Sequence, residues 1–397
     1  MMTKEHMDRR AFLTSVVGTA AAFSAMPDGA FGLAGGRPPM EYIVESAQAP
    51  EEPSVPAHRI KFAVIGINHY HIFGQVDAVI HGGGDLVALY ASEPDLVANF
   101  VKRYPQVKTC RSEAEILEDP SIKLVASSII PNQRAPLGIR VMRHGKDYLS
   151  DKPGFTTLEQ LDEVRKVQKE TGQIYAIMYS ERLEVKAAVK AGDLVKDGAI
   201  GKVVQTVNLA PHQIQQKNSP GRPEWFWDPV KNGGILCDIG SHQADQFLFY
   251  TGSTAAEVTA SQIANVNHPQ HPSFQDFGDM MLHGSGGAGY VRVDWFTPDG
   301  VGTWGDGRLF ILGTEGYIEL RKYVDITGRK GGNHLFIVDQ KQARYIDCNN
   351  VPLPFGGQFV SDILNRTHTA QDQAGAFLAA ELVLKAQRDA KVLTFTS

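Results

Sequence analysis

An apolar run that ends at a glycine, Ile60 to Gly66, constrains this chain more than any other stretch. The segment that follows, as far as Gly74, is compatible with a helix, so the stretch predicts a buried parallel strand that leads into a helix N-terminus. Unpaired N–H groups and the helix dipole favour an anion there, and a pyrophosphate is the expected ligand. In the fingerprint G-x-G-x-x-G, Gly66 is in place, whereas Asn68 and His71 occupy the other two glycine positions. By itself, the stretch fits an ordinary βα turn as well as a cofactor site.

Apolar runs and helix-compatible segments alternate from about residue 60 to residue 178, which predicts a doubly wound parallel sheet. After Ile60–Gly66, strands are expected at Leu86 to Tyr90, Leu124 to Ile130 and Gln173 to Met178, and helices at Ile72 to Ile80, Ser112 to Leu117, Ala135 to His144 and Leu158 to Thr171. We therefore assign residues 58–178 to a Rossmann domain that binds a dinucleotide.

The regular alternation of strand-like and helix-like segments ends at about residue 179. A helix is expected at Glu184 to Ala191, and a final amphipathic helix at about Ala370 to Ala390. Between them, β-type runs separated by glycine and Asp/Asn turns predict a large, mostly antiparallel open sheet. The runs are Lys202 to Ala210, Glu257 to Val266, Phe277 to His283, Gly289 to Phe296, Leu309 to Leu312, Gly316 to Leu320 and Leu335 to Asp339. Residues 179–397 are thus assigned to an α+β domain for substrate binding and oligomerisation, and its open sheet predicts a homodimer or homotetramer.

The N-terminus is expected to lie outside the fold. Paired arginines, Arg9 and Arg10, precede a short run of small apolar residues, which predicts a twin-arginine export signal in residues 1–35 and a periplasmic protein. The run is too short and too rich in alanine for a membrane span, and the alternative is a frayed helix. Residues 36–57, rich in Pro, Gly, Ala and Glu, are expected to form a linker or extended arm.

Composition narrows the classes of partner. The 397 residues suffice for two domains, and the net charge of -5 argues against nucleic acid or an anionic membrane as the main partner. The three cysteines, Cys110, Cys237 and Cys348, are scattered, so we expect buried thiols rather than a disulfide framework or a zinc motif.

The end of the second strand bears on the choice of nucleotide. Dinucleotide-binding folds that take NAD usually carry an acidic residue there to bond the adenosine ribose, and Glu93 could serve. Ser92 with Lys102 or Arg103 could instead suit the 2′-phosphate of NADP, so the choice between NAD and NADP stays open. A loop at Pro131 and Asn132 is expected to close over the nicotinamide side.

Two further patterns carry chemistry. Asp151-Lys152-Pro153 follows a strand, and a lysine held there could exchange a proton with a sugar hydroxyl, although a surface lysine in a turn is the alternative. The stretch Gly233 to Asp245 contains Asp238 and His242 four positions apart, so a helical turn would place both on one face. A histidine beside a carboxylate is a common arrangement for proton transfer.

Together with the β-rich second half, these patterns resemble the glucose–fructose oxidoreductase / inositol dehydrogenase (Gfo/Idh/MocA) family over about residues 60–390. The family's Glu-Lys-Pro motif corresponds to Asp151-Lys152-Pro153. Its motif G-G-x-x-x-D-x-G-x-H-x-x-D is matched by Gly233, Gly234, Asp238, Gly240, His242 and Asp245. The resemblance implies NAD or NADP as cofactor and a carbohydrate substrate. It also implies that Lys152, Asp238 and His242 surround the reacting carbon, with His242 as the acid/base and Lys152 polarising the same oxygen.

The remaining candidate residues follow from this resemblance. The nucleotide is expected to contact Gly66, Asn68, His69, His71, Ser92, Glu93, Pro131, Asn132, Lys152 and Pro153. The substrate is expected to contact Arg182, Arg222, Trp225, Trp227 and Asp228, because aromatic rings stack on sugar faces and charged side chains bond hydroxyls. His69 with His71, or His268 with His271 near Asp276, could bind a metal, but neither pair has a third ligand at convincing spacing, so no metal site is expected.

Three functions are compatible with these motifs. The first is an NAD(P)-dependent oxidoreductase that acts on a hydroxyl of a sugar, polyol or glycoside, with tightly bound nucleotide. The second is a glycosidase that uses bound NAD for a transient oxidation, elimination and reduction. The third is a non-catalytic sugar-binding protein that has kept the fold.

Overall fold

The computed structural model describes residues 43–46, 59–215 and 221–395. The expected twin-arginine signal and most of the expected linker lie outside these described residues. The linker includes one described strand, β1 (Ile43–Ser46), which pairs with β15 (Ala343–Asp347) at an edge of the larger of two sheets. Within the described ranges, no helix is long and apolar enough to cross a membrane.

Six parallel strands form the smaller sheet, in the order β4-β3-β2-β5-β6-β7. They are β2 (Ile60–Ile65), β3 (Gly84–Tyr90), β4 (Lys108–Thr109), β5 (Ile122–Ser127), β6 (Asp147–Asp151) and β7 (Tyr175–Met178). This order confirms the predicted Rossmann sheet. It reverses between β2 and β5, and ligands of such sheets bind at this switch point, beyond the carboxyl ends of the strands.

Helices connect these strands: α2 (Ile72–His81), α3 (Pro94–Arg103), α4 (Ala114–Leu117), α5 (Pro131–Arg143) and α6 (Leu158–Thr171). The prediction of a loop at Pro131 and Asn132 is wrong, because both residues belong to the first turn of α5. Proline suits the first helical position, since its fixed φ is helical and the N–H that it lacks has no partner within the helix.

Ten strands form the larger sheet, in the order β1-β15-β14-β13-β12-β8-β11-β10-β9-β16. Its other strands are β8 (Val203–Pro211), β9 (Ala256–Ala264), β10 (Phe277–Gly284), β11 (Gly287–Asp294), β12 (Arg308–Gly313), β13 (Gly316–Arg321), β14 (His334–Asp339) and β16 (Lys391–Val392). Most pairs are antiparallel, as predicted, whereas β1–β15, β8–β11 and β9–β16 are parallel.

The helices of the second half are α7 (Ser180–Leu183), α8 (Lys186–Lys196), α9 (Pro229–Asn232), α10 (Ile235–Asp238), α11 (Gly240–Thr251), α12 (Phe355–Asn365) and α13 (Gln373–Asp389). The helix expected at Glu184 to Ala191 begins instead at Lys186, after the separate turn α7. Helix α12 was not predicted, because Pro354, Gly356 and Gly357 give its first turn the composition of a loop.

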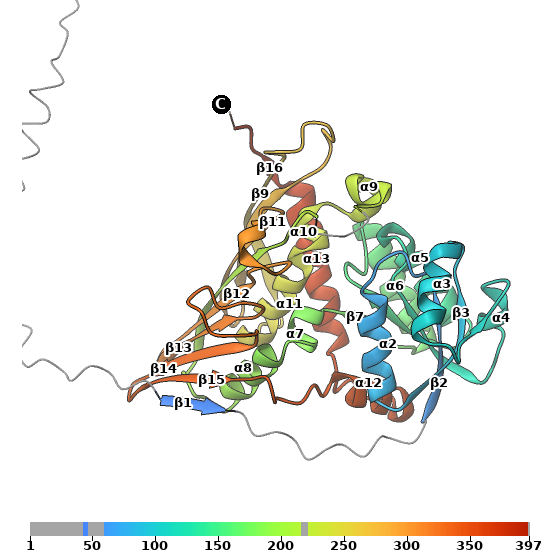
Figure 1. Ribbon diagram of the computed structural model, residues 1–397, viewed down its shortest axis with the longest axis horizontal. Helices are drawn as coiled ribbons and strands as arrows, with labels where there is room; N and C mark the ends of the chain where they lie inside the picture. Colours follow the sequence, from blue (N-terminus) through green and yellow to red (C-terminus); the bar gives the residue numbers. More distant parts are fainter. Residues whose placement is uncertain (1–42, 47–58, 216–220, 396–397) are drawn as a thin grey trace, which may run out of the picture. The chain divides into compact units, whose positions relative to one another are not determined.

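Helix α13 joins the two sheets. It contacts β9 of the larger sheet and both β7 and α6 of the smaller one, and it lies between the sheets in Figure 1. Helices α10 and α11 also pack against it, so the carboxyl edge of the parallel sheet faces the segment that carries Asp238. One buried core therefore runs from Phe62 on β2 to Val383 on α13, and includes Cys237.

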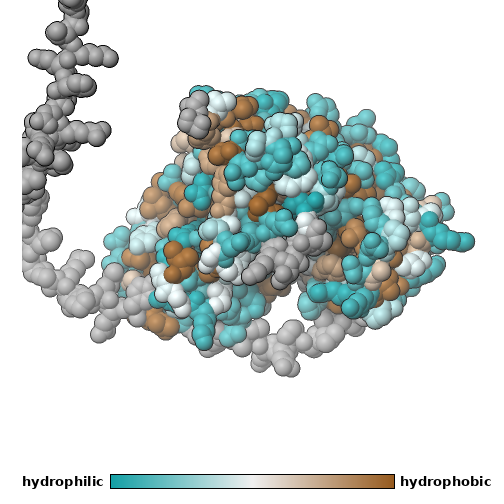
Figure 2. All heavy atoms as spheres, turned by 45° about the horizontal axis from the view of Figure 1, so that its top comes forward, coloured by the Kyte–Doolittle hydropathy of each residue, from teal (hydrophilic) through white to brown (hydrophobic). Residues whose placement is uncertain are grey.

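Several large apolar side chains on the larger sheet remain exposed. They are Val204, Met281, Leu312 and Tyr317, on β8, β10, β12 and β13. Figure 2 shows hydrophobic side chains as separate patches among hydrophilic ones on the face in view. Single exposed apolar residues are normal for a folded protein, so these patches alone do not define an interface.

Replacing Gly66 with alanine is expected to lower the free energy of unfolding by about 2 kcal/mol or more. Gly66 has φ +77°, and an added Cβ would lie 2.6 Å from Cβ of Ile129, so the change introduces both backbone strain and overlap. Gly74→Ala is the matched control, because that added Cβ on α2 would meet nothing within 4 Å, and it should stabilise the chain slightly. Urea unfolding of both variants measures the difference, and equal stabilities would contradict this account of the turn.

Candidate active site

A cavity lies beyond the carboxyl end of β6 and contains residues of both sheets. About 420 Å³ of space, part of it open to solvent, lies among its lining residues. The side chains that line it are His69, Tyr70, His71, Lys152, His212, Gln213, Arg222, Trp225, Phe226, Asp238, Trp295 and Trp304. The cavity therefore combines charged groups, imidazoles and aromatic rings.

Lys152 and Asp238 meet in this cavity, although they are 86 residues apart. Lys152 follows the last residue of β6, and its Nζ donates a hydrogen bond of 2.9 Å to Oδ1 of Asp238 at the end of α10. The Lys152 side chain is 6% exposed, and the Lys152–Pro153 peptide is cis. The structure thus brings together the two motifs that the sequence predicts to act on one substrate.

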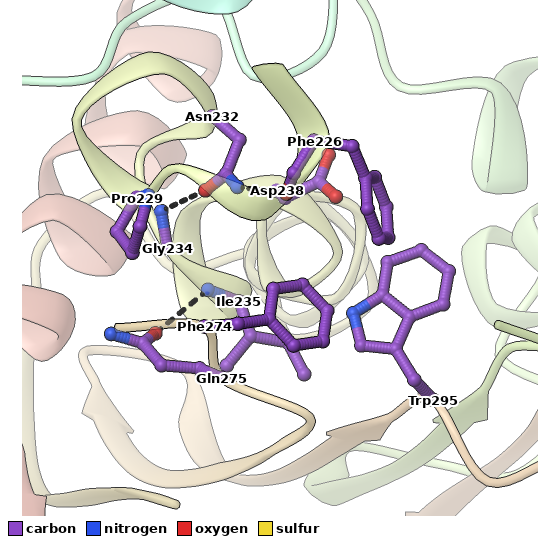
Figure 3. Close-up of a pocket in the computed structure, with 9 residues that line it drawn as sticks. All are labelled: Phe226, Pro229, Asn232, Gly234, Ile235, Asp238, Phe274, Gln275 and Trp295. Atoms are coloured by element: carbon purple, nitrogen blue, oxygen red, sulfur yellow. Dashed lines mark hydrogen bonds between the residues drawn. The ribbon is translucent and has the colours of Figure 1, made fainter. Parts of the chain in front are cut away.

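The glycine pair before Asp238 sets the start of α10. Gly234 has φ +83°, and an added Cβ would lie 2.4 Å from the Gln387 side chain, so only glycine fits there. Figure 3 shows how the turn is held: the Gly234 N–H donates to Oδ1 of Asn232, and the Ile235 N–H donates to Oε1 of Gln275. These contacts fix the short helix whose last residue is Asp238.

The prediction that one helical turn carries both Asp238 and His242 is wrong, because α10 ends at Asp238 and α11 begins at Gly240. The His242 side chain is buried, packs edge-on against Tyr179, and leaves Nδ1 without a hydrogen-bond partner among the described residues. Burial lowers the pKa of His242 well below its usual value, and the positive charge of Lys152 lowers it further. The imidazole is therefore neutral at physiological pH.

The fingerprint loop reaches both the nucleotide edge and the cavity. The Nδ2 group of Asn68 donates 2.8 Å to Oε1 of Glu93, which precedes α3 and stands beyond the end of β3. His69 is tied to the end of β5 by its N–H, which donates to the Ser128 carbonyl. The His71 N–H donates a hydrogen bond to Nδ1 of His69. A side chain therefore already accepts one of the backbone N–H groups at the N-terminus of α2. Ser92 is exposed beside this edge.

Asp151 organises a buried cluster that the sequence analysis missed. Its carboxylate accepts hydrogen bonds from His71 Nδ1 (3.0 Å), Arg134 Nη2 (3.0 Å) and the Lys152 N–H (2.8 Å). Burial would raise the pKa of Asp151, but Arg134 and His71 outweigh burial and hold the pKa well below its usual value. Arg134 also donates to the carbonyls of Lys152 and Pro153, so the cluster fixes the backbone of the motif.

His69, His71 and Asp151 could together hold a metal ion, since their ligand atoms lie within 4.8 Å of one another. Asp151 is the third ligand that sequence spacing did not reveal. The Arg134 guanidinium bonds the same carboxylate, however, and the Lys152 ammonium is close by, so the group already contains its cation. We therefore interpret the cluster as an ion pair between Arg134 and Asp151 that positions Lys152, and not as a metal site.

The expected substrate residues divide into two sets. Arg222 and Trp225 line the cavity. Arg182 does not: it pairs with Asp245 (2.5 Å) beneath Phe249 and lines a different hollow beside α8 and α12.

Trp227 and Asp228 are also outside the set of lining residues. Trp227 stacks on His271 at 4.0 Å, and Asp228 accepts the Val230 N–H at the start of α9, so both have structural roles. The structure therefore does not bring Arg182, Trp227 and Asp228 to the cavity that Arg222 and Trp225 line.

Five lining aromatic or imidazole side chains were not predicted: Tyr70, His212, Phe226, Trp295 and Trp304. Burial lowers the pKa of His212 to about 4, so this imidazole is neutral. His212 packs against both Trp295 and Trp304. Tyr70 lies in the loop before α2, His212 directly follows β8, and Trp295 directly follows β11. No local motif marks these lining residues.

Comparison with known proteins identifies an NAD-binding Rossmann fold in the first half of the chain and a family-specific C-terminal domain in the second. A family model described as an oxidoreductase family with an NAD-binding Rossmann fold matches residues 60–179. A model of the GFO/IDH/MocA C-terminal domain matches residues 188–319. The matched regions contain Lys152, Asp238 and the fingerprint loop.

Individual relatives agree with these models. A structure from Erwinia carotovora atroseptica, described as a candidate oxidoreductase, is 45% identical and has a TM-score of 0.81, with 84% of this chain and 100% of that chain covered. A curated 1,5-anhydro-D-fructose reductase of Ensifer adhaerens is 27% identical over 47% of this chain, but the match spans only 54% of that protein. Levoglucosan dehydrogenase in complex with NADH and L-sorbose, 15% identical over 83% of this chain and 97% of that one, shares the fold with a TM-score of 0.68.

Proposed function

Because the chain belongs to the Gfo/Idh/MocA family of oxidoreductases, we propose that it oxidises a hydroxyl group of a sugar, polyol or glycoside with NAD or NADP. The observation that carries this proposal is the contact of 2.9 Å between Lys152 and Asp238 inside a cavity lined by aromatic side chains. Relatives add support, since one is named a 1,5-anhydro-D-fructose reductase and another a scyllo-inositol 2-dehydrogenase.

The residues present suit a nucleotide at the switch point. Gly66 allows the tight turn after β2, and the carboxylate of Glu93, held by Asn68, stands where an adenosine ribose would be bonded. Arg103 pairs with Asp77 and bonds Tyr104, which leaves Lys102 and Ser92 as the candidates for a 2′-phosphate. Because the carboxylate of Glu93 lies at this edge, we propose NAD rather than NADP as the preferred form.

The chemistry follows from the charges in the cavity. The bound nucleotide supplies the hydride acceptor, so that a CH–OH group becomes C=O while one hydride and one proton leave. The Lys152 ammonium donates a hydrogen bond to the reacting oxygen, and Asp238 holds that ammonium in place. The resemblance to the family assigns the hydroxyl proton to His242, which is buried and is not among the lining residues of the cavity.

Export and assembly belong to the same proposal. The paired arginines Arg9 and Arg10 support twin-arginine export, a route for folded proteins, which would let an enzyme leave the cytoplasm with its nucleotide bound. The open face of the larger sheet supports a homo-oligomer. Cell fractionation and the solution mass of the exported protein test these two points.

The function is tested on full-length protein purified after export. Denaturation and mass spectrometry should release NAD at near one molecule per chain, and added sugars should reduce it to NADH. A protein that neither carries nor takes up nucleotide would overturn the proposal. Release of free sugar from a glycoside without net NADH would favour the NAD-dependent glycosidase, and sugar binding unaffected by Lys152→Ala or His242→Ala would favour the non-catalytic alternative.

A further inference from the structure

Charged side chains in and around the cavity are matched almost one for one. Three buried or nearly buried cations each have a carboxylate partner at 3.0 Å or less: Lys152 with Asp238, Arg134 with Asp151, and Lys322 with Glu181. A charge that is removed from water without a partner costs several kcal/mol, so such matching is expected in a folded chain. A cation that lines the cavity without a carboxylate partner is therefore a candidate to bind an anionic ligand.

Arg222 is that cation. It lines the same cavity, and among the described residues it forms no ion pair with a carboxylate. Its Nε and Nη2 groups donate to the carbonyls of Ile214 (2.6 Å) and Gln213 (3.0 Å), which carry no charge. A guanidinium has five N–H donors, so at least three remain for a ligand.

The surroundings of Arg222 hold its partly buried guanidinium in place. Its guanidinium carbon lies 4.5 Å from the ring centre of Phe226 and 4.9 Å from that of Trp295. These two rings and the two carbonyls fix the plane of the group, so little conformational freedom is lost when a ligand binds. A preorganised, partly desolvated guanidinium is a strong site for a carboxylate or phosphate.

We infer that the substrate is an anionic sugar, whose carboxylate or phosphate bonds Arg222 while its reacting hydroxyl lies at Lys152 and Asp238. The inference rests on the proposed function, because it names the substrate class of the same cavity. A sugar with one negative charge would complete the charge matching of the cavity. The rings of Trp225 and Trp304 line the remaining wall, where an apolar sugar face can stack.

The test uses full-length, nucleotide-loaded protein and pairs of sugars that differ only in the anionic group: glucose, glucuronate and glucose 6-phosphate, with the corresponding galactose series. Calorimetric binding and NADH formation are both measured. At least one anionic sugar should exceed its neutral counterpart by about 10- to 100-fold in affinity or kcat/KM. Comparison of the carboxylate sugars with the phosphate sugars shows which of the two anionic groups Arg222 binds.

Arg222→Gln should reduce this preference by about 10- to 100-fold, and Arg222→Lys, which keeps the charge, should retain part of it. Arg308→Gln is the matched control, since Arg308 is a partly buried arginine that pairs with Asp306 and does not line the cavity. The inference is wrong if no anionic sugar binds more tightly than its neutral counterpart, or if Arg308→Gln removes the preference equally. Binding of an anionic sugar through Arg222 without NADH formation would instead leave the inference standing and overturn the proposed oxidoreductase function.

Discussion

Lys152→Met is expected to lower kcat/KM by about 10²- to 10³-fold, the usual cost of removing one hydrogen-bond donor to the reacting oxygen. Lys152 is the ammonium that faces the cavity beside Asp238, and its side chain is 6% exposed, so water cannot easily replace it. Methionine preserves length and apolar packing but removes the donor to the reacting oxygen. Steady-state kinetics with the best sugar from the substrate panel measures the loss.

A second change separates a catalytic role from a structural one. Lys152→Met leaves the Asp238 carboxylate without its partner, and this should cost stability. Adding Asp238→Asn removes that unpaired charge, so the double variant should recover stability without recovering activity. Lys385→Met is the matched control, because Lys385 forms an exposed pair with Glu381, and it should change neither quantity. Recovery of activity in the double variant would contradict a direct role for Lys152.

The parts of the fold that sequence could predict are those with a local signal. Buried parallel strands such as Ile60–Ile65 are continuous apolar runs, and they were placed to within a few residues. Seven of the ten strands of the larger sheet, β8 to β14, were also predicted, from β-type runs separated by turn residues, whereas β1, β15 and β16 were not. The partners of the strands were not predicted: β8 pairs in parallel with β11, about 80 residues further along the chain, and no local pattern specifies such a long-range pairing.

In the candidate site, too, the features with a local sequence signal were predicted and the long-range contacts were not. Lys152 and Asp238 were paired correctly because each lies in a motif that resembles one family. The contact between His71 and Asp151 was missed, since it joins the altered glycine position to a motif 80 residues away. Arg182 was misplaced for a similar reason: it follows β7 closely, but α7 turns its side chain toward Asp245 and Phe249. Motifs identify chemistry, whereas the direction of a single side chain depends on the elements packed around it.

Arg134→Met is expected to lower the free energy of unfolding by about 3–5 kcal/mol, because it leaves the buried Asp151 carboxylate without its main cation. Both side chains of this pair are 1% exposed, and Arg134 also bonds the carbonyls of Lys152 and Pro153. Arg140→Met on the same helix is the matched control: Arg140 pairs with Glu113 at the surface, where its side chain is 47% exposed. That change should cost about 1 kcal/mol or less.

The pH dependence gives an independent check on the same pair. The folded pKa of Asp151 is held below its unfolded value, so its stabilising contribution is complete above about pH 4 and is lost as the pH falls toward the folded pKa. Arg134→Met removes one of the charges that depress this pKa, and the acid side of the stability profile should therefore flatten. Urea unfolding across this pH range measures the slope in the wild type and both variants. If Arg140→Met flattened the profile as much as Arg134→Met, the stabilisation could not be assigned to the buried pair that holds Lys152.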